Sequence, residues 1–154
     1  MVQEQIFCIV DMQYPFVSDE DAHRIEAVAL ASLAARNRNE RIFVLEDTHG
    51  HSTHDRIKQA LCGYDRVSYL RKSQWDGSLQ VEIEACQHQL NPAHITVCGA
   101  YAEQCVLATI VGLRDRYPTT RLTMIREACC PAPTRQFTDH DWERTSRRLA
   151  VSLN

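Results

Sequence analysis

Asp11, Lys72 and Cys105, which could together perform nucleophilic catalysis, each come shortly after a separate apolar run. A thiol becomes a strong nucleophile once a base removes its proton, and a carboxylate can be that base. A nearby ammonium group can stabilise the negative charges. These residue types predict an activated-nucleophile site, provided that the fold brings the three runs to one edge.

Structural roles are the alternative for each of the three residues. Cys105 stands at the start of a predicted helix, where the helix dipole lowers the pKa of a thiol, but cysteine is also a common packing residue. Asp11 could cap a turn before Pro15, and Lys72 could be a solvated strand-end residue. The combination favours catalysis, because a carboxylate at the end of a buried strand is costly without a partner.

The elements that must position these residues follow from an alternation of short apolar runs with segments of helical spacing. Strands are predicted at 6–10, 42–45, 67–70, 94–98 and 121–125. Helices are predicted at about 20–37, 54–62, 78–90, 103–116 and 138–151. This order predicts a Rossmann-like α/β fold, a three-layer αβα sandwich with a mainly parallel sheet of five or six strands. We expect a single domain over residues 1–154.

The carboxyl ends of the strands are where ligands bind in open parallel sheets. The polar groups expected there are Asp11, Gln13, Asp47, His49, His51, His54, Lys72 and Trp75, with the segments 99–105 and 127–130. The chemistry of the protein should come from this set.

Composition argues against several other classes of protein. The 154 residues carry a net charge of −3, with 44% hydrophobic and 24% charged residues, so no large positive field attracts nucleic acid. No apolar run approaches the roughly 18 residues of a membrane helix. The seven cysteines lack the spacing of a secreted disulfide framework. We expect a cytoplasmic protein that binds neither nucleic acid nor membrane.

Several short motifs occur along the chain in a fixed order. Each motif alone is weak evidence for a family, but their order and spacing together are specific. They are Val-Asp-Met-Gln at 10–13 followed by Phe16, Lys72 followed by Trp75, Gly with five residues and then Cys-Val at 99–106, and Glu-Ala-Cys at 127–129. From about residue 5 to residue 133, this pattern resembles the isochorismatase-like cysteine hydrolases. That family includes nicotinamidases and carbamoyl-amide hydrolases.

The resemblance implies a catalytic triad and a reaction. Cys105 would attack the carbonyl of a small-molecule amide after Asp11 takes its proton, with Lys72 as the charge stabiliser, and water would hydrolyse the thioester. Backbone N–H groups of Tyr101 and Cys105 would form the oxyanion hole. Relatives carry a cis peptide at the position between Ala100 and Tyr101, and they often form homo-oligomers.

Side chains near this edge are candidates for substrate contacts. The candidates are Gln13, Phe16, Trp75 and Tyr101, with a planar or apolar amide packed between the rings. Core packing is the alternative for each ring. Tyr-Pro at 14–15 replaces the common Asn-Asp, Trp75 comes earlier after the lysine than the usual aromatic, and the chain ends sooner than most members. These departures leave the substrate open.

A loop rich in histidine is a candidate metal site. Asp47 and His49 are similar to the start of the metal motif of nicotinamidases, and His54 is the third candidate ligand, for Zn or Fe. No cofactor is required by the triad. The alternative is a polar loop that caps the next helix, with Ser52 or Thr53 as the N-cap residue.

Two other functions remain open at this stage. A vinyl-ether hydrolase acting on isochorismate would use the Asp and the Lys without needing Cys105. A non-catalytic binding protein could keep the same fold. Rapid labelling of Cys105 alone by iodoacetamide near pH 7 would favour the cysteine hydrolase.

Overall fold

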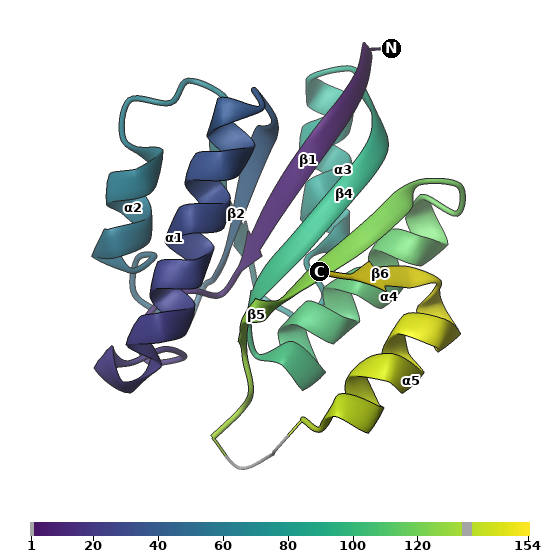
Figure 1. Cartoon of the computed structure of the whole chain (residues 1–154). Helices are drawn as coiled ribbons and strands as arrows, with labels where there is room; N and C mark the ends of the chain where they lie inside the picture. Colours follow the sequence, from purple (N-terminus) through teal and green to yellow (C-terminus); the bar gives the residue numbers. More distant parts are fainter. Residues whose placement is uncertain (1, 134–136) are drawn as a thin grey trace.

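The computed structural model describes residues 2–133 and 137–154, and its centre is a parallel sheet of six strands in the order β3-β2-β1-β4-β5-β6 (Figure 1). The strands are β1 (Val2–Val10), β2 (Arg41–Asp47), β3 (Val67–Lys72), β4 (Leu90–Ala100), β5 (Arg121–Cys130) and β6 (Val151–Leu153). Every pairing in the sheet is parallel.

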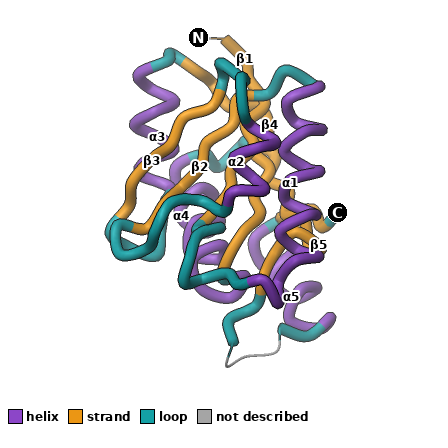
Figure 2. Tube along the Cα trace, turned by 90° about the vertical axis from the view of Figure 1, so that its left-hand side faces the viewer, coloured by secondary structure: helices purple, strands orange, loops and turns teal. Residues whose placement is uncertain are grey.

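Helices cover both faces of this sheet. They are α1 (Ala22–Asn37), α2 (Asp55–Leu61), α3 (Ser78–Gln87), α4 (Leu107–Arg116) and α5 (Asp139–Leu149), with a short 3₁₀ turn η1 (Asp19–Asp21) and a π-helical turn η2 (Ala102–Val106). Helices α1 and α2 lie on one face, and α3 and α4 lie on the other, as Figure 2 shows from the side. The three-layer α/β fold predicted from the sequence is confirmed.

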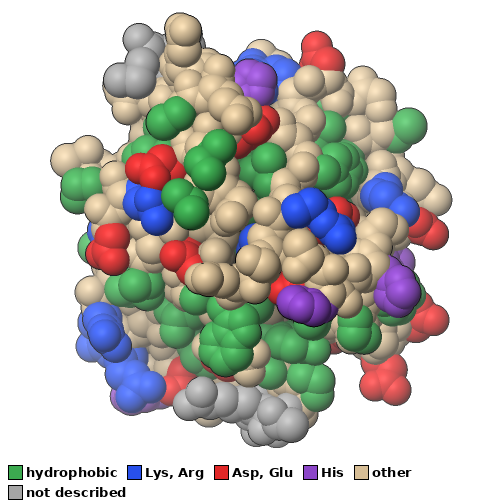
Figure 3. Space-filling model, turned by 180° about the vertical axis from the view of Figure 1, so that it is seen from behind, with side chains coloured by type: hydrophobic (Ala, Val, Ile, Leu, Met, Phe, Trp, Pro, Cys, Tyr) green, Lys and Arg blue, Asp and Glu red, His purple; other side chains and the backbone are tan. Residues whose placement is uncertain are grey.

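The core is formed by the central strands and the helix faces that cover them. The apolar run 6–10 of β1 is at most 1% exposed, and Ile95 and Val97 of β4 are fully buried beside it. Burial on both faces is the reason that these strands read as continuous apolar runs. On the face seen from behind in Figure 3, hydrophobic side chains lie in small groups among polar and charged ones.

Two predicted boundaries near the C-terminal end are wrong. The last helix does not reach residue 151, because Ala150 adopts a left-handed conformation (φ 50°) and the strand β6 follows. The segment 127–130 does not follow the fifth strand but belongs to β5, where Cys129 and Cys130 pair with the end of β4. A register shift in this pairing lets β5 continue beyond its first apolar run.

None of the helices in the described part of the chain is long and apolar enough to cross a membrane.

Candidate active site

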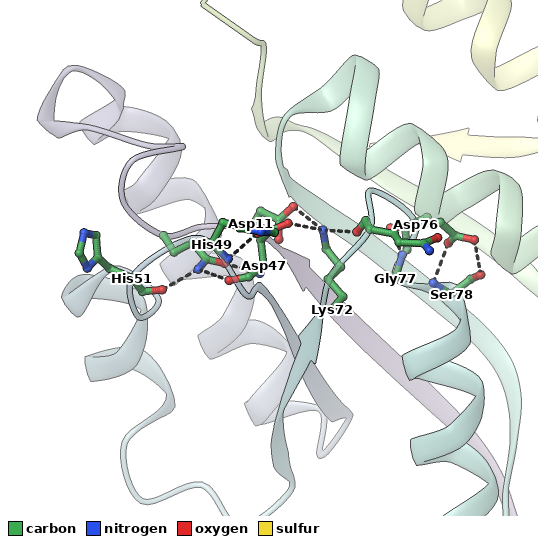
Figure 4. Close-up of polar contacts among 11 residues, drawn as sticks. Asp11, Asp47, His49, His51, Lys72, Asp76, Gly77 and Ser78 are labelled. Atoms are coloured by element: carbon green, nitrogen blue, oxygen red, sulfur yellow. Dashed lines mark hydrogen bonds and ion pairs between the residues drawn. The ribbon is translucent and has the colours of Figure 1, made fainter.

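Asp11 and Lys72 meet at the carboxyl edge of the sheet, although 61 residues separate them in sequence. Lys72 is the last residue of β3, and Asp11 directly follows β1. Asp11 has a positive φ of 50°, and its N–H donates to the carbonyl of Leu45 at 2.9 Å. The chain therefore turns sharply after β1, and Figure 4 shows the Asp11 carboxylate and the Lys72 ammonium group facing each other.

The Lys72 ammonium group is a buried cation with three oxygen neighbours. Its Nζ donates to Oδ2 of Asp11 at 2.7 Å and to the carbonyl of Gln74 at 3.0 Å, and Oδ2 of Asp47 lies 4.0 Å away. The side chains of Lys72 and Asp11 are 0% and 1% exposed. A buried charge of this kind is tolerated only when it is paired. Asp47, expected only as a metal ligand, therefore contributes a second negative charge beside Lys72.

The Asp11 carboxyl group is held in the interior of the protein. Burial raises the pKa of its carboxyl, the hydrogen bond and charge of Lys72 oppose that shift, and Cys105 lowers the pKa further. Oδ1 of Asp11 is also buried. Among the residues that the structure describes, none donates a hydrogen bond of ordinary geometry to it. One oxygen is thus fixed by Lys72, and the other is open to accept a proton.

Cys105 lies in η2, just beyond β4, and is 8% exposed. Burial, followed by the charge of Asp11, raises the pKa of the Cys105 thiol to about 12, while Lys72 and a hydrogen bond from the backbone of Tyr101 lower it. Desolvation thus opposes the lowering of this pKa that the sequence led us to expect from the start of a helix. A pKa raised in this way favours the thiol form of Cys105 over the thiolate.

Gly99 brings the loop that carries Tyr101 and Cys105 against β1. Its φ is +134°, and a Cβ atom at Gly99 would lie 2.0 Å from the carbonyl oxygen of Val10. Only glycine permits this close approach. The Ala100–Tyr101 peptide bond that follows is cis. The Tyr101 ring meets the ring of Phe16 edge to face, with centroids 6.0 Å apart, so these two aromatic candidates lie together.

Comparison with known proteins decides the family. The model of the Isochorismatase domain family matches residues 5–153. The chain belongs to the isochorismatase family. This membership confirms the resemblance found in the motifs and the expected enzyme class, a hydrolase. No curated protein matches the chain.

Solved structures share the fold of this isochorismatase-family protein at low sequence identity. Nicotinamidase from Staphylococcus aureus is 13% identical with a TM-score of 0.77, and the match covers 99% of this chain and 100% of that one. N-carbamoylsarcosine amidase from Thermoplasma acidophilum is also 13% identical with a TM-score of 0.77, over 99% and 96% of the chains. Pyrazinamidase of Pyrococcus horikoshii in complex with zinc is 14% identical with a TM-score of 0.70, over 98% of both chains.

The side-chain amide of Gln13 forms hydrogen bonds with backbone groups in this isochorismatase-family protein. Its Nε2 donates to the carbonyls of Asp47 at 3.1 Å and His51 at 2.5 Å, and its Oε1 accepts from the N–H of Asp47 at 2.7 Å. The residue is fully buried, and a Cβ atom at Gly50 would lie 2.3 Å from Nε2. Gln13 thus ties the loop after β1 to the loop after β2, a role that the sequence analysis did not anticipate.

Trp75 occupies a more open position than the other aromatic candidates. Its side chain is 62% exposed, whereas Phe16 and Tyr101 are partly buried against the core. The structure therefore brings Phe16 and Tyr101 together and places no described contact between Trp75 and either ring.

The three candidate metal ligands of this family member do not converge. Asp47 contacts Nδ1 of His49 at 3.0 Å, but the His49 side chain is 81% exposed. Nδ1 of His54 accepts the backbone N–H of Arg56 at 3.2 Å and so caps α2, a role expected for Ser52 or Thr53. The Lys72 cation beside Asp47 also disfavours a second cation. Within the described ranges, no three His, Cys, Asp or Glu side chains are arranged as metal ligands.

Proposed function

We propose that the protein is a cysteine hydrolase that cleaves the C–N bond of a small-molecule amide through a thioester on Cys105. The observation that carries this proposal is the buried Asp11 carboxylate, whose Oδ2 is held by Lys72 at 2.7 Å while its charge perturbs the Cys105 thiol. A base, a stabilising cation and a nucleophile thus act on one another in a desolvated place. The nicotinamidase and the N-carbamoylsarcosine amidase of the same fold support an amide substrate.

The first step is the attack of Cys105 on the amide carbonyl carbon. Oδ1 of Asp11 takes the thiol proton as the S–C bond forms, and the carbonyl oxygen becomes an oxyanion. Because the pKa of the free thiol is raised to about 12, proton transfer and attack are best coupled in one step. Lys72 remains protonated and offsets the negative charge that passes from Asp11 to the substrate.

The oxyanion needs hydrogen-bond donors aimed at its position. In this proposal the donors are the backbone N–H groups of Tyr101, the residue before η2, and of Cys105 within it. The backbone of Tyr101 lies close enough to the Cys105 thiol to lower its pKa, which supports this assignment because a donor then stands beside the reacting sulfur. The ring pair of Phe16 and Tyr101 would then border a planar or apolar acyl group.

The second half of the reaction returns the enzyme to its starting state. The C–N bond breaks, and the departing nitrogen takes the proton from Asp11, which releases ammonia or an amine and leaves a thioester. Asp11 then takes a proton from water as the water oxygen attacks the thioester carbon. The C–S bond breaks, the thiolate recovers the proton, and a carboxylic acid leaves.

The test is a screen of small amides for ammonia or amine release by wild type and Cys105→Ala. We expect one class of amide to be turned over by wild type and a loss of more than about tenfold in Cys105→Ala, because the nucleophile is gone. Cys62→Ala, which removes an exposed thiol outside the site, is the matched control and should keep full activity. A vinyl-ether hydrolase would keep its activity in Cys105→Ala, and a non-catalytic protein would turn over no compound.

A further inference from the structure

Strand β3 forms the longer of the two edges of the sheet. It has six residues, whereas β6 at the opposite edge has three. Figure 2 shows β3 beside β2, with no further strand outside it. Bulges, prolines and short length are common devices that keep an edge strand from pairing with another chain. The register between β2 and β3 has no shift, and β3 contains no proline, so this edge lacks these devices.

The backbone of β3 has free hydrogen-bonding groups along this edge. The N–H of Ile42 donates to the carbonyl of Arg66, and the N–H of Thr48 donates to the carbonyl of Lys72, both at 2.9 Å. Alternate residues of a strand in a parallel pair direct their backbone groups toward the same neighbour. The even-numbered residues of β3 therefore bond to β2, and the odd-numbered residues 67, 69 and 71 point outward. Within the described ranges, no turn, loop or side-chain group bonds to these outward groups.

The two ends of this edge carry opposite charges. Arg71 lies near the carboxyl end, is about half exposed, and uses one of its nitrogens to contact Glu46 at 3.2 Å. Asp65 is exposed just before the amino end and forms no ion pair with a described residue. The cation next to it, Arg66, is already bonded to Glu4 at 2.6 Å. A second copy of the strand in antiparallel orientation therefore matches opposite charges at both ends, whereas a parallel copy brings like charges together.

We propose that β3 pairs antiparallel with β3 of a second copy of this chain, so that the two sheets join across a two-fold axis at Ser68. Val67 of each copy then lies opposite Tyr69 of the other, and their outward backbone groups bond to each other. Tyr69 is 44% exposed, and an aromatic ring opposite a β-branched side chain is a favourable cross-strand pair. Arg71 of each copy meets Asp65 of the other. An axis at Tyr69 would instead place Arg71 opposite Val67, so the charges favour Ser68.

The experiment is analytical ultracentrifugation of the full chain over a range of protein concentrations. We expect a reversible dimer with a dissociation constant on the order of 10 μM, as suits a small interface. Tyr69→Pro should keep the fold, because the N–H that it removes does not bond to β2, and proline is tolerated at such edge positions. Circular dichroism and urea unfolding check the fold. The dimer of this variant should dissociate at least about tenfold more readily, since its edge can no longer pair.

A charge exchange tests the orientation of the two strands. Asp65→Lys alone and Arg71→Glu alone should each weaken the dimer by about fivefold or more, because each places like charges opposite one another. The double variant should recover most of the affinity. Residues 65 and 71 lie roughly 20 Å apart in one extended chain, so this recovery has to come from contacts between two copies. The charge variants decide the question if Tyr69→Pro proves unstable.

The matched control is Leu30→Lys, which changes an apolar side chain on α1 that is 56% exposed and far from β3 in the sequence. This variant should dimerise as wild type does. The proposal is independent of the amide hydrolysis proposed above, and no step of the test measures activity. A wild type that stays monomeric throughout would leave the edge to a strand of another protein and overturn the proposal. A dimer that Tyr69→Pro leaves intact, or a double charge variant as weak as the single ones, would also overturn it.

Discussion

Nζ of Lys72 lies 2.7 Å from Oδ2 of Asp11, and both side chains are almost completely enclosed by protein. Two opposite charges buried together stabilise each other, but each has lost its water. Removing one partner therefore leaves an uncompensated charge, which makes this pair the most sensitive point of the proposed site. Arg71, the neighbour of Lys72, pairs with Glu46 at 3.2 Å while it is half exposed, so it offers an internal comparison.

Lys72→Met should destabilise the protein and disable its base. We expect a loss of about 3–5 kcal/mol in the free energy of unfolding, because a buried carboxylate loses its cation. The pKa of Asp11, already raised by burial, should rise further, so the acid limb of kcat/KM should move to higher pH. Urea unfolding and a pH–rate profile measure the two effects. Lys72→Arg keeps the positive charge, so its free energy of unfolding and the position of its acid limb should lie between those of wild type and Lys72→Met.

The control for this prediction is Arg71→Met, which should cost no more than about 1 kcal/mol because its ion pair is partly solvated. The double variant Asp11→Asn with Lys72→Met should recover part of the lost stability, since the Asp11 charge is removed together with its closest cation. A Lys72→Met protein with wild-type stability and an unchanged acid limb would show that Lys72 neither stabilises the Asp11 charge nor supports catalysis.

The apolar runs were sufficient to predict the parallel sheet, because strands buried on both faces leave a continuous signal, as in the run 6–10. The sequence did not predict the short strand β6, because three residues are too few to show a periodic pattern of apolar side chains. The contact between Asp11 and Lys72 depends on the strand order β3-β2-β1, which no local pattern encodes. The raised pKa of Cys105 was missed for a similar reason, because desolvation depends on residues that tertiary packing brings close.

Gly99→Ala should be far more disruptive than a comparable change at Gly63. Both residues have positive φ, but a Cβ atom at Gly63 meets nothing within 4 Å, whereas at Gly99 it meets the backbone of Val10. We expect a loss of about 1 kcal/mol for Gly63→Ala from conformational strain alone, and of about 3 kcal/mol or more for Gly99→Ala. Urea unfolding gives both values. Equal losses would show that β1 and β4 can separate at this end without cost.

The loop that contains His49, His51 and His54 should have a structural role, as a cap of α2, and should bind no metal ion. We expect protein purified without a His tag to contain well under one Zn or Fe per chain, and chelation to leave activity unchanged. His54→Ala should cost about 1 kcal/mol, because the cap of α2 is lost, whereas His49→Ala should cost less. Elemental analysis and urea unfolding measure these effects. One metal per chain, removed together with activity by a chelator, would contradict this view of the loop.

Cys105 should be alkylated slowly near pH 7, in contrast to the rapid labelling expected from the sequence, because its raised pKa favours the thiol over the thiolate. With a pKa raised to about 12, the thiolate fraction is small at pH 7, so the iodoacetamide rate should rise about tenfold per pH unit up to roughly pH 10. The exposed Cys62 and Cys86 are first changed to Ser so that they do not mask this signal. Lys72→Met should lower the rate at every pH, since the cation that favours the thiolate is gone. A fast neutral rate with a plateau below pH 8 would show instead that Lys72 and the Tyr101 backbone outweigh burial and hold the thiolate before substrate binds.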